Sequence, residues 1–161
     1  FYIGSLISGG FFLSAPLVDK INQHLKEAIK TKDEVRLSCL RVLKAAVTNE
    51  QGRRTEPLKD EDVQAVIQSL VRKGQEAATE FRKGLREDMA AKEEAEVKIL
   101  SGYLPQQLSP AEIESVLKEI IAEVSASGPK DLGKIMKAAM GRLAGKVQGK
   151  EVNEIAKRLL G

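Results

Sequence analysis

From Leu17 onward, apolar residues recur at three- and four-residue steps along almost the whole chain. This spacing places them on one face of an α-helix. Asp60 has the character of a helix N-cap, and Gly84 that of a helix stop. The first predicted helices span about residues 17–29, 35–47, 60–81 and 86–104. No stretch alternates apolar and polar residues with a period of two, so we predict an all-α fold.

A sharp break follows at the segment "YLPQQL". Pro105 cannot continue the preceding helix, because it lacks an N–H and its ring clashes with the previous turn. The sequence Ser109-Pro110-Ala111-Glu112 forms a capping box with proline at the first helical position. It predicts a new helix over residues 110–124. Two short helices within residues 131–160 follow, joined by a glycine-rich connector.

This break predicts two domains. Residues 17–104 are expected to form an N-terminal domain of about four helices, and residues 105–161 a small C-terminal domain of three helices. Residues 1–16, "FYIGSLISGGFFLSAP", carry no charge and differ from the rest of the chain. We expect them to be a non-native arm, such as a cloning remnant. The end of a targeting segment and an adventitious apolar arm are the alternatives.

Composition agrees with a helical protein. The chain has 161 residues, of which 42% are hydrophobic and 30% charged, with no Trp. Its core must therefore be built mainly from Leu, Ile, Val and Ala. A single cysteine excludes an internal disulfide and fits a reducing compartment, so we expect a cytoplasmic location. The uncharged start falls short of the roughly 18 apolar residues that a membrane span requires, and no membrane partner is expected.

Charge is distributed unevenly along the chain. Residues 130–161 hold eight Lys or Arg against three acidic residues, a net charge of +5. Residues 1–129 hold 18 basic and 20 acidic residues, a net charge of −2. Clustered Lys and Arg neutralise the phosphates of a polyanion and release its counterions. The alternative is an ordinary solvated helix face.

Candidate catalytic residues are few. His24 is the only histidine, is expected at the surface, and has no Ser or Cys partner at a suitable spacing. Cys39 is expected to be a core or half-buried thiol. The run Glu93, Glu94 and Glu96 lies beside lysines, which favours a solvated face over a pair of catalytic carboxylates. The sequence therefore predicts no catalytic residue, no metal site and no cofactor.

The glycine-rich connector was compared with a phosphate-binding loop. Gly141, Gly145 and Gly149 recur every four residues, and Lys146 and Lys150 each follow a glycine. A P-loop needs four residues between its glycines, then Lys and Ser or Thr, after a strand. Here three residues separate the glycines and an acidic residue follows the last lysine. Nucleotide hydrolysis is excluded. Turn geometry is the favoured role, and contact with a phosphate of a larger ligand stays open.

Three segments resemble a known family: "KTKDEVRLSCLRVLKAAVTNE" at 30–50, "FRKGLREDMAAKEEAEVKILSGYLPQQLSPAEIE" at 81–114, and "DLGKIMKAAMGRLAGKVQGKEVNEIAKRLL" at 131–160. They are similar to the GatB/YqeY family. It comprises small stand-alone YqeY-like proteins and the C-terminal tail domain of the B subunit of the tRNA-dependent Asp/Glu amidotransferase. The middle segment resembles the stand-alone branch.

The resemblance implies a two-part helical architecture. It also implies a tRNA-contacting role, because the related tail domain looks like a tRNA-contacting appendage. An association with carbon–nitrogen ligases that use glutamine as amide donor comes with the family. Nothing in this chain resembles their glutaminase or kinase-like centres, so we expect no independent catalysis.

Two hypotheses about function follow. In the first, the chain is a non-catalytic module that binds tRNA or another structured RNA. The residues predicted to contact phosphates are Lys134, Lys137, Arg142, Lys146 and Lys150. In the second, it is an accessory factor of an amidotransferase or another protein, docking through acidic N-terminal helices. A purely structural role stays open, and the sequence does not predict an oligomeric state.

Overall fold

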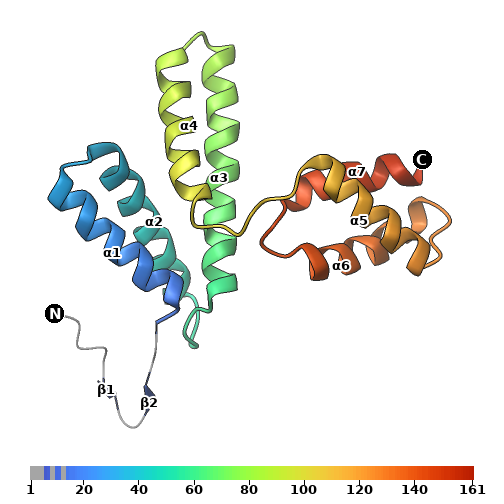
Figure 1. Cartoon of the computed structure of the whole chain (residues 1–161), viewed down its shortest axis with the longest axis horizontal. Coiled ribbons are helices and arrows are strands. Elements are labelled where there is room, and N and C mark those ends of the chain that lie inside the picture. Colours follow the sequence, from blue (N-terminus) through green and yellow to red (C-terminus); the bar gives the residue numbers. More distant parts are fainter. Residues whose placement is uncertain (1–5, 8–9, 12–13) are drawn as a thin grey trace. The chain divides into compact units, whose positions relative to one another are not determined.

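The computed structural model describes residues 6–7, 10–11 and 14–161, and it confirms the all-α prediction (Figure 1). Four helices precede the Tyr103 boundary and three follow it. The helices of the first group are α1 (Pro16–Thr31), α2 (Glu34–Gly52), α3 (Asp60–Lys83) and α4 (Glu87–Ser101). Those of the second are α5 (Pro110–Glu123), α6 (Leu132–Leu143) and α7 (Gly149–Leu160), with a short 3-10 turn, η1 (Pro129–Asp131), before α6.

The arm predicted over residues 1–16 lies partly outside the described residues. Two short strands, β1 (Leu6–Ile7) and β2 (Gly10–Phe11), pair antiparallel within it. The last residues of the predicted arm belong to the first helix. Ala15 is buried and is the N-cap of α1, and the Ser14 hydroxyl donates to the Asp19 carboxylate at 2.6 Å.

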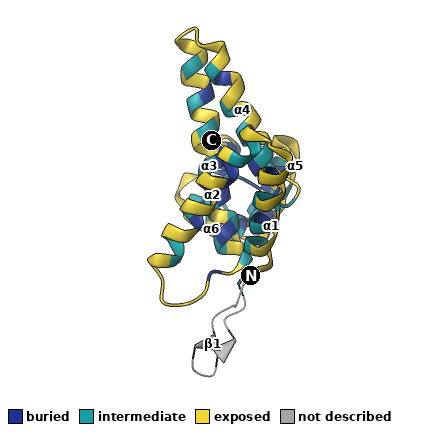
Figure 2. Cartoon of the chain, turned by 90° about the vertical axis from the view of Figure 1, so that its left-hand side faces the viewer, coloured by how far each residue is buried: buried dark blue, intermediate teal, exposed yellow. Residues whose placement is uncertain are grey.

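The chain divides into two compact units after Tyr103; the sequence had placed this boundary after Leu104. In the N-terminal unit, α1 packs on α2, and α3 and α4 form a hairpin whose turn lies away from both (Figure 1). Buried residues lie on the faces that these helices turn toward each other (Figure 2). The largest fully buried side chains of this unit are Leu40, Leu43, Val63 and Ile67.

The prediction that Asp60 caps α3 is wrong. Asp60 is the first residue of α3, and its carboxylate accepts a hydrogen bond at 3.0 Å from the N–H of Leu17, at the start of α1. Asp62 caps the start of α3 instead, because its carboxylate accepts a hydrogen bond from the Lys59 N–H at 2.9 Å. Asp62 therefore caps its own helix, whereas Asp60 accepts a hydrogen bond from a residue of α1 that lies 43 positions earlier in the sequence.

The C-terminal unit has its own core. Isoleucines of α5 and α6 are fully buried in it together with apolar residues of α7; the core comprises Ile113, Leu117, Ile120, Ile135, Ala139, Leu143, Val147, Val152, Ile155 and Ala156. The predicted capping box is present at its start. The Ser109 hydroxyl accepts from the Glu112 N–H at 3.3 Å, and the Glu112 carboxylate accepts from the Ser109 N–H at 2.7 Å. In the described part of the chain, none of the helices is long and apolar enough to cross a membrane.

Candidate nucleic-acid interface

The five residues predicted to contact RNA lie on consecutive elements of the C-terminal unit, and all five are exposed. Lys134, Lys137 and Arg142 belong to α6, Lys146 to the α6–α7 connector, and Lys150 to the first turn of α7. Two of these five residues form ion pairs within the unit, and the other three form none with the described residues.

Two of the five residues have partners inside the unit. The Arg142 guanidinium donates to Glu123 of α5. The Lys134 ammonium lies 3.7 Å from the Asp131 carboxylate. A second arginine outside the predicted set behaves similarly, since Arg158 donates to Glu114 of α5 at 2.7 Å. Carboxylates of α5 therefore hold the arginines of both α6 and α7.

Helix α5 also changes the charge balance that the sequence had indicated. With α5 included, residues 104–161 carry nine basic and seven acidic residues, a net charge of +2. Residues 1–103 carry 17 basic and 16 acidic residues, a net charge of +1. The N-terminal unit is therefore not acidic. Residues 1–129 have a negative net charge only because they include the acidic helix α5. The basic excess is therefore confined to residues 130–161 of the C-terminal unit.

Of the five predicted residues, three form no ion pair among the described residues: Lys137, Lys146 and Lys150. We call them the three-lysine surface. Successive helical residues are rotated by about 100°, which places Lys137 about 140° around α6 from Arg142. On α7, Lys150 lies about 80° around the helix from Arg158 by the same rule. Since both arginines turn toward α5, Lys137 and Lys150 are rotated away from the side of their helices that carries these arginines.

The connector that carries Lys146 is held by the segment before α5. The Leu108 N–H donates to the Lys146 carbonyl at 2.9 Å, and the Gln107 side-chain amide donates to the Gly145 carbonyl at 2.8 Å. Gly145 has a φ of 78°, a conformation that glycine adopts without strain. Val147, the next residue of the connector, is buried and only 2% exposed. The backbone at Lys146 is therefore fixed, while its ammonium stays exposed. This role of the "PQQL" segment could not be predicted from the sequence, because the bonds join positions 38 residues apart.

The chemistry of this surface favours contacts with a nucleic-acid backbone. An exposed lysine ammonium offers three donors and a full positive charge to phosphate oxygens. Residues 104–161 contain no Phe, Tyr, Trp or His. They therefore offer no aromatic ring on which an unpaired base could stack, as single-strand readers do. The arginines, which could also stack, are held by α5.

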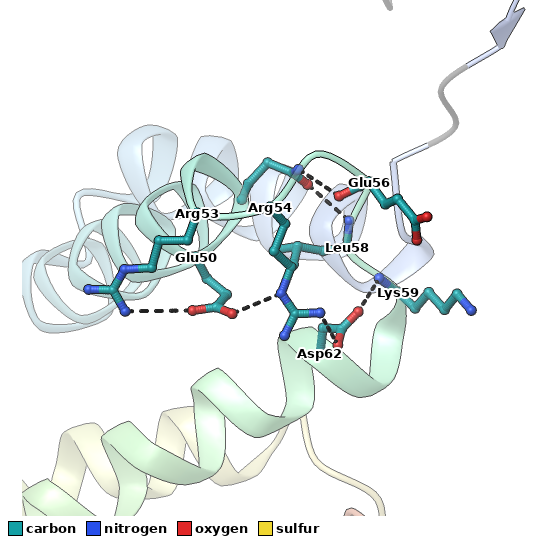
Figure 3. A network of polar contacts seen from close by, with 8 residues as sticks. Glu50, Arg53, Arg54, Glu56, Leu58, Lys59 and Asp62 are labelled. Carbon is teal, nitrogen blue, oxygen red and sulfur yellow. Dashed lines mark hydrogen bonds and ion pairs between the residues drawn. The ribbon is translucent and has the colours of Figure 1, made fainter.

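The N-terminal unit contains a polar network at the α2–α3 connection (Figure 3). Arg54 donates to Glu50 at 2.9 Å and to Asp62 at 2.7 Å. The Gln51 side chain donates to the Glu56 carbonyl and accepts from the Leu58 N–H. The Lys59 N–H and the Arg54 guanidinium together hold the pKa of Asp62 below its usual value. These groups satisfy one another, so the network fixes the connection and leaves few polar groups for a ligand.

His24, which was expected at the surface without a partner, is half-buried. Its Nδ1 lies 2.6 Å from the hydroxyl of Tyr103, the last residue of the unit. Tyr103 is 8% exposed, and burial raises its pKa, while Arg36 opposes that rise. Lys20 lies 5.9 Å from the centre of the same ring. The histidine therefore anchors a tyrosine. This pair could not be predicted from local sequence patterns, since 79 positions separate its members.

Cys39 is buried, as expected. Burial and the nearby Glu96 raise the pKa of its thiol to about 12. A thiol with this pKa is almost entirely protonated at neutral pH and is a poor nucleophile. Within residues 6–7, 10–11 and 14–161, no three His, Cys, Asp or Glu side chains gather in a way that could hold a metal ion.

Comparison with known proteins identifies relatives of the whole helical part of the chain. The sequence model of the family described as "Yqey-like protein" matches residues 18–160. "Altered inheritance of mitochondria protein 41, mitochondrial" from Pyrenophora tritici-repentis is 24% identical over 85% of this chain and 74% of its own length. The protein of the same name from Lachancea thermotolerans is 27% identical over 78% of this chain and 71% of its own length.

Proposed function

Because the chain belongs to the family of YqeY-like proteins, we propose that it is a non-catalytic helical module that binds structured RNA such as tRNA. One observation carries the proposal. The three-lysine surface offers unpaired ammonium groups on a unit that has no aromatic residue. Such a surface suits the phosphates of a folded RNA, which is recognised by shape and backbone more than by sequence. The similarity to the amidotransferase tail domain supports the same class of ligand.

The proposal assigns no chemical step to this chain. His24 is engaged with Tyr103, and the Cys39 thiol has a pKa of about 12. Neither is the activated nucleophile or general base of a hydrolase or transferase. The association of the family with carbon–nitrogen ligases that use glutamine is therefore proposed to reflect a binding role beside such an enzyme.

Binding of tRNA is tested directly by fluorescence anisotropy. A labelled tRNA transcript is titrated with the full chain at several salt concentrations. We expect binding at micromolar protein and a linear fall of log K with log salt concentration. Each phosphate neutralised by a lysine contributes about 0.7 to 0.9 to that slope. Binding that is absent at micromolar protein, or that does not depend on salt, would contradict the proposal.

A second candidate function is that of an accessory factor acting through protein contacts. The observation that favours it is a groove in the N-terminal unit, which is lined in part by apolar residues and lies in a different unit from Lys137, Lys146 and Lys150. Addition of the chain to a tRNA-dependent amidotransferase assay discriminates this candidate. If protein contacts carry the function, adding the chain should change the rate of the amidotransferase. A variant without the three lysines should still change that rate.

Location in the cell is likewise a proposal. The single cysteine favours a reducing compartment, for which we propose the cytoplasm. The relatives named above have "mitochondrial" in their names, so an organelle is the alternative. Microscopy of the tagged full-length protein in its own cells decides between them.

A further inference from the structure

Two adjoining hollows lie between α2 and the α3–α4 hairpin. One has a volume of about 400 Å³ and extends toward Arg53 and Asp62. The other, of about 230 Å³, extends toward Val42 and Val97. Leu70 and Lys73 line both hollows, so the hollows are neighbours, and we treat them as one groove. We call it the α2–hairpin groove.

Apolar and charged side chains from all three helices line the groove. Its apolar lining includes Ala46, Val66, Leu70, Ala77, Val97 and Leu100. At its edge on α2, Val42 is 54% exposed, and Val35, two helical turns earlier, is 48% exposed. Apolar side chains that line a hollow and are left in water are typical of a surface that a partner covers.

The dimensions of the groove fit a short helix. It follows α2 from Val42 to Arg53, a helical rise of about 16 Å, or about three turns. Val35, Val42 and Asn49 are spaced by seven residues and therefore share one side of α2. A helix that lies along this side can place one apolar residue per turn over the floor, as in other helix-in-groove complexes.

The two ends of the groove differ in charge. At one end, Arg54 already holds both Glu50 and Asp62 (Figure 3). The neighbouring Arg53 is left with a 3.9 Å pair to Glu50 and a side chain that is 79% exposed. Lys73 lies next along the groove and forms no ion pair with any residue that the structure describes. Because Lys73 lines both hollows, Arg53 is the exposed positive charge that belongs to this end alone.

The other end is negative. Glu93 and Glu96 of α4 both line the hollow there. Burial and the nearby Glu93 raise the pKa of Glu96, so a cation placed at this end would stabilise its charged form.

We propose that the α2–hairpin groove binds an amphipathic helix of a partner protein, about three turns long. Its apolar stripe covers Val66, Leu70 and Val97, its acidic first turn lies beside Arg53, and its basic last turn lies beside Glu93 and Glu96. The helix then runs antiparallel to α2. This arrangement agrees with the helix dipole, which favours acidic residues in a first turn and basic residues in a last turn. The proposal concerns the N-terminal unit and does not depend on RNA binding.

A designed peptide tests the proposal. The probe is a fluorescein-labelled, roughly 16-residue helical peptide with leucines spaced by three and four residues, two glutamates in its first turn and two lysines in its last. Its matched partner has the same composition with these charges exchanged. We expect the full chain to bind the first peptide more tightly. Equal affinity for both peptides, or binding to neither, would overturn the proposal.

Three variants of the full chain locate the site. Val42→Glu should weaken binding by about tenfold or more, since burial of a valine contributes on this order. The double variant R53E/K73E should reverse the preference between the two peptides. Val124→Glu, at an exposed valine of the C-terminal unit, is the control and should change nothing. A Val42→Glu variant that binds as tightly as the original chain contradicts the assignment.

A second copy of the chain is the competing occupant. It would appear as a concentration-dependent dimer in light scattering, and V42E would abolish this dimer, which would overturn the assignment to a partner helix. Circular dichroism and retained tRNA binding show that the variants are folded. Because the lysines lie in the other unit, V42E is expected to keep its tRNA affinity, so failure of one proposal leaves the other testable.

Discussion

A Cβ atom placed on Gly74 of α3 would lie 2.7 Å from Cγ2 of Val97 on α4. This is closer than the contact distance of two carbon atoms, so the helices of the hairpin approach each other here because position 74 has no side chain. Glycine in the middle of a helix otherwise costs about 1 kcal/mol relative to alanine.

We therefore expect Gly74→Ala to destabilise the N-terminal unit, although alanine is the better helix former. Overpacking of this kind costs about 1–3 kcal/mol. Val97→Ala should relieve the contact, so the double variant should recover part of the loss. Urea unfolding measures both free energies.

Gly141→Ala in α6 is the matched control for Gly74→Ala. Nothing lies within 4 Å of a Cβ placed there, so the variant should stabilise the C-terminal unit by up to about 1 kcal/mol. If both alanines shift stability in the same direction, the close approach at Gly74 does not constrain the hairpin.

The hydroxyl of Tyr103 provides a second prediction. Tyr103→Phe keeps the ring but removes the hydrogen bond to His24, which should cost about 1 kcal/mol of unfolding free energy. The imidazole resonances of His24 in NMR spectra should shift, because Nδ1 loses its partner. Unchanged His24 resonances would contradict the pairing.

The capping box gives a prediction about pH. Hydrogen bonds from the Ser109 N–H and hydroxyl lower the pKa of Glu112 in the folded state. A carboxyl group whose pKa is lowered by folding stabilises the folded state at pH values above its unfolded-state pKa. This stabilisation is lost as the pH falls through the folded-state pKa. A carboxyl ¹³C NMR titration should give Glu112 a midpoint below the ordinary glutamate value of about 4.3. Ser109→Ala removes the hydroxyl but keeps the backbone N–H, so that midpoint should rise only in part, and an unchanged midpoint would show that the hydroxyl does not contribute.

Glu123 is expected to restrain RNA binding. Because it holds Arg142, Glu123→Gln should weaken this ion pair and remove a negative charge from the C-terminal unit. We expect tighter tRNA binding and a salt slope steeper by up to about 1. Glu76→Gln, which changes the net charge equally in the N-terminal unit, is the control. Equal effects of the two variants would show that only net charge matters.

Much of the local structure could be predicted from the sequence. The helical spacing of apolar residues placed the seven α-helices found in the described part of the chain, and the capping box at Ser109 is present as expected. These features depend on residues a few positions apart, which the sequence shows directly. Asp60 is the exception, because it resembles a local cap but its carboxylate serves Leu17 of α1.

The candidate site was predictable only in part. Arg142 could not be separated from Lys137 by sequence, since its partner Glu123 lies 19 positions away on another helix. The pairing of His24 with Tyr103 and the α2–hairpin groove also arise from long-range packing. A charge count along the chain finds where basic residues gather, but not which of them have partners.

The most direct test of RNA binding by the three-lysine surface compares two triple variants in tRNA anisotropy titrations over a range of salt. K137A/K146A/K150A removes the surface, and K26A/K30A/K44A removes three exposed lysines of the N-terminal unit that form no ion pair with any described residue. The account predicts that the first variant loses affinity and that its salt slope falls by about 2 to 3, while the second retains most of its affinity. Equal losses in both variants, or an unchanged slope in the first, would contradict it.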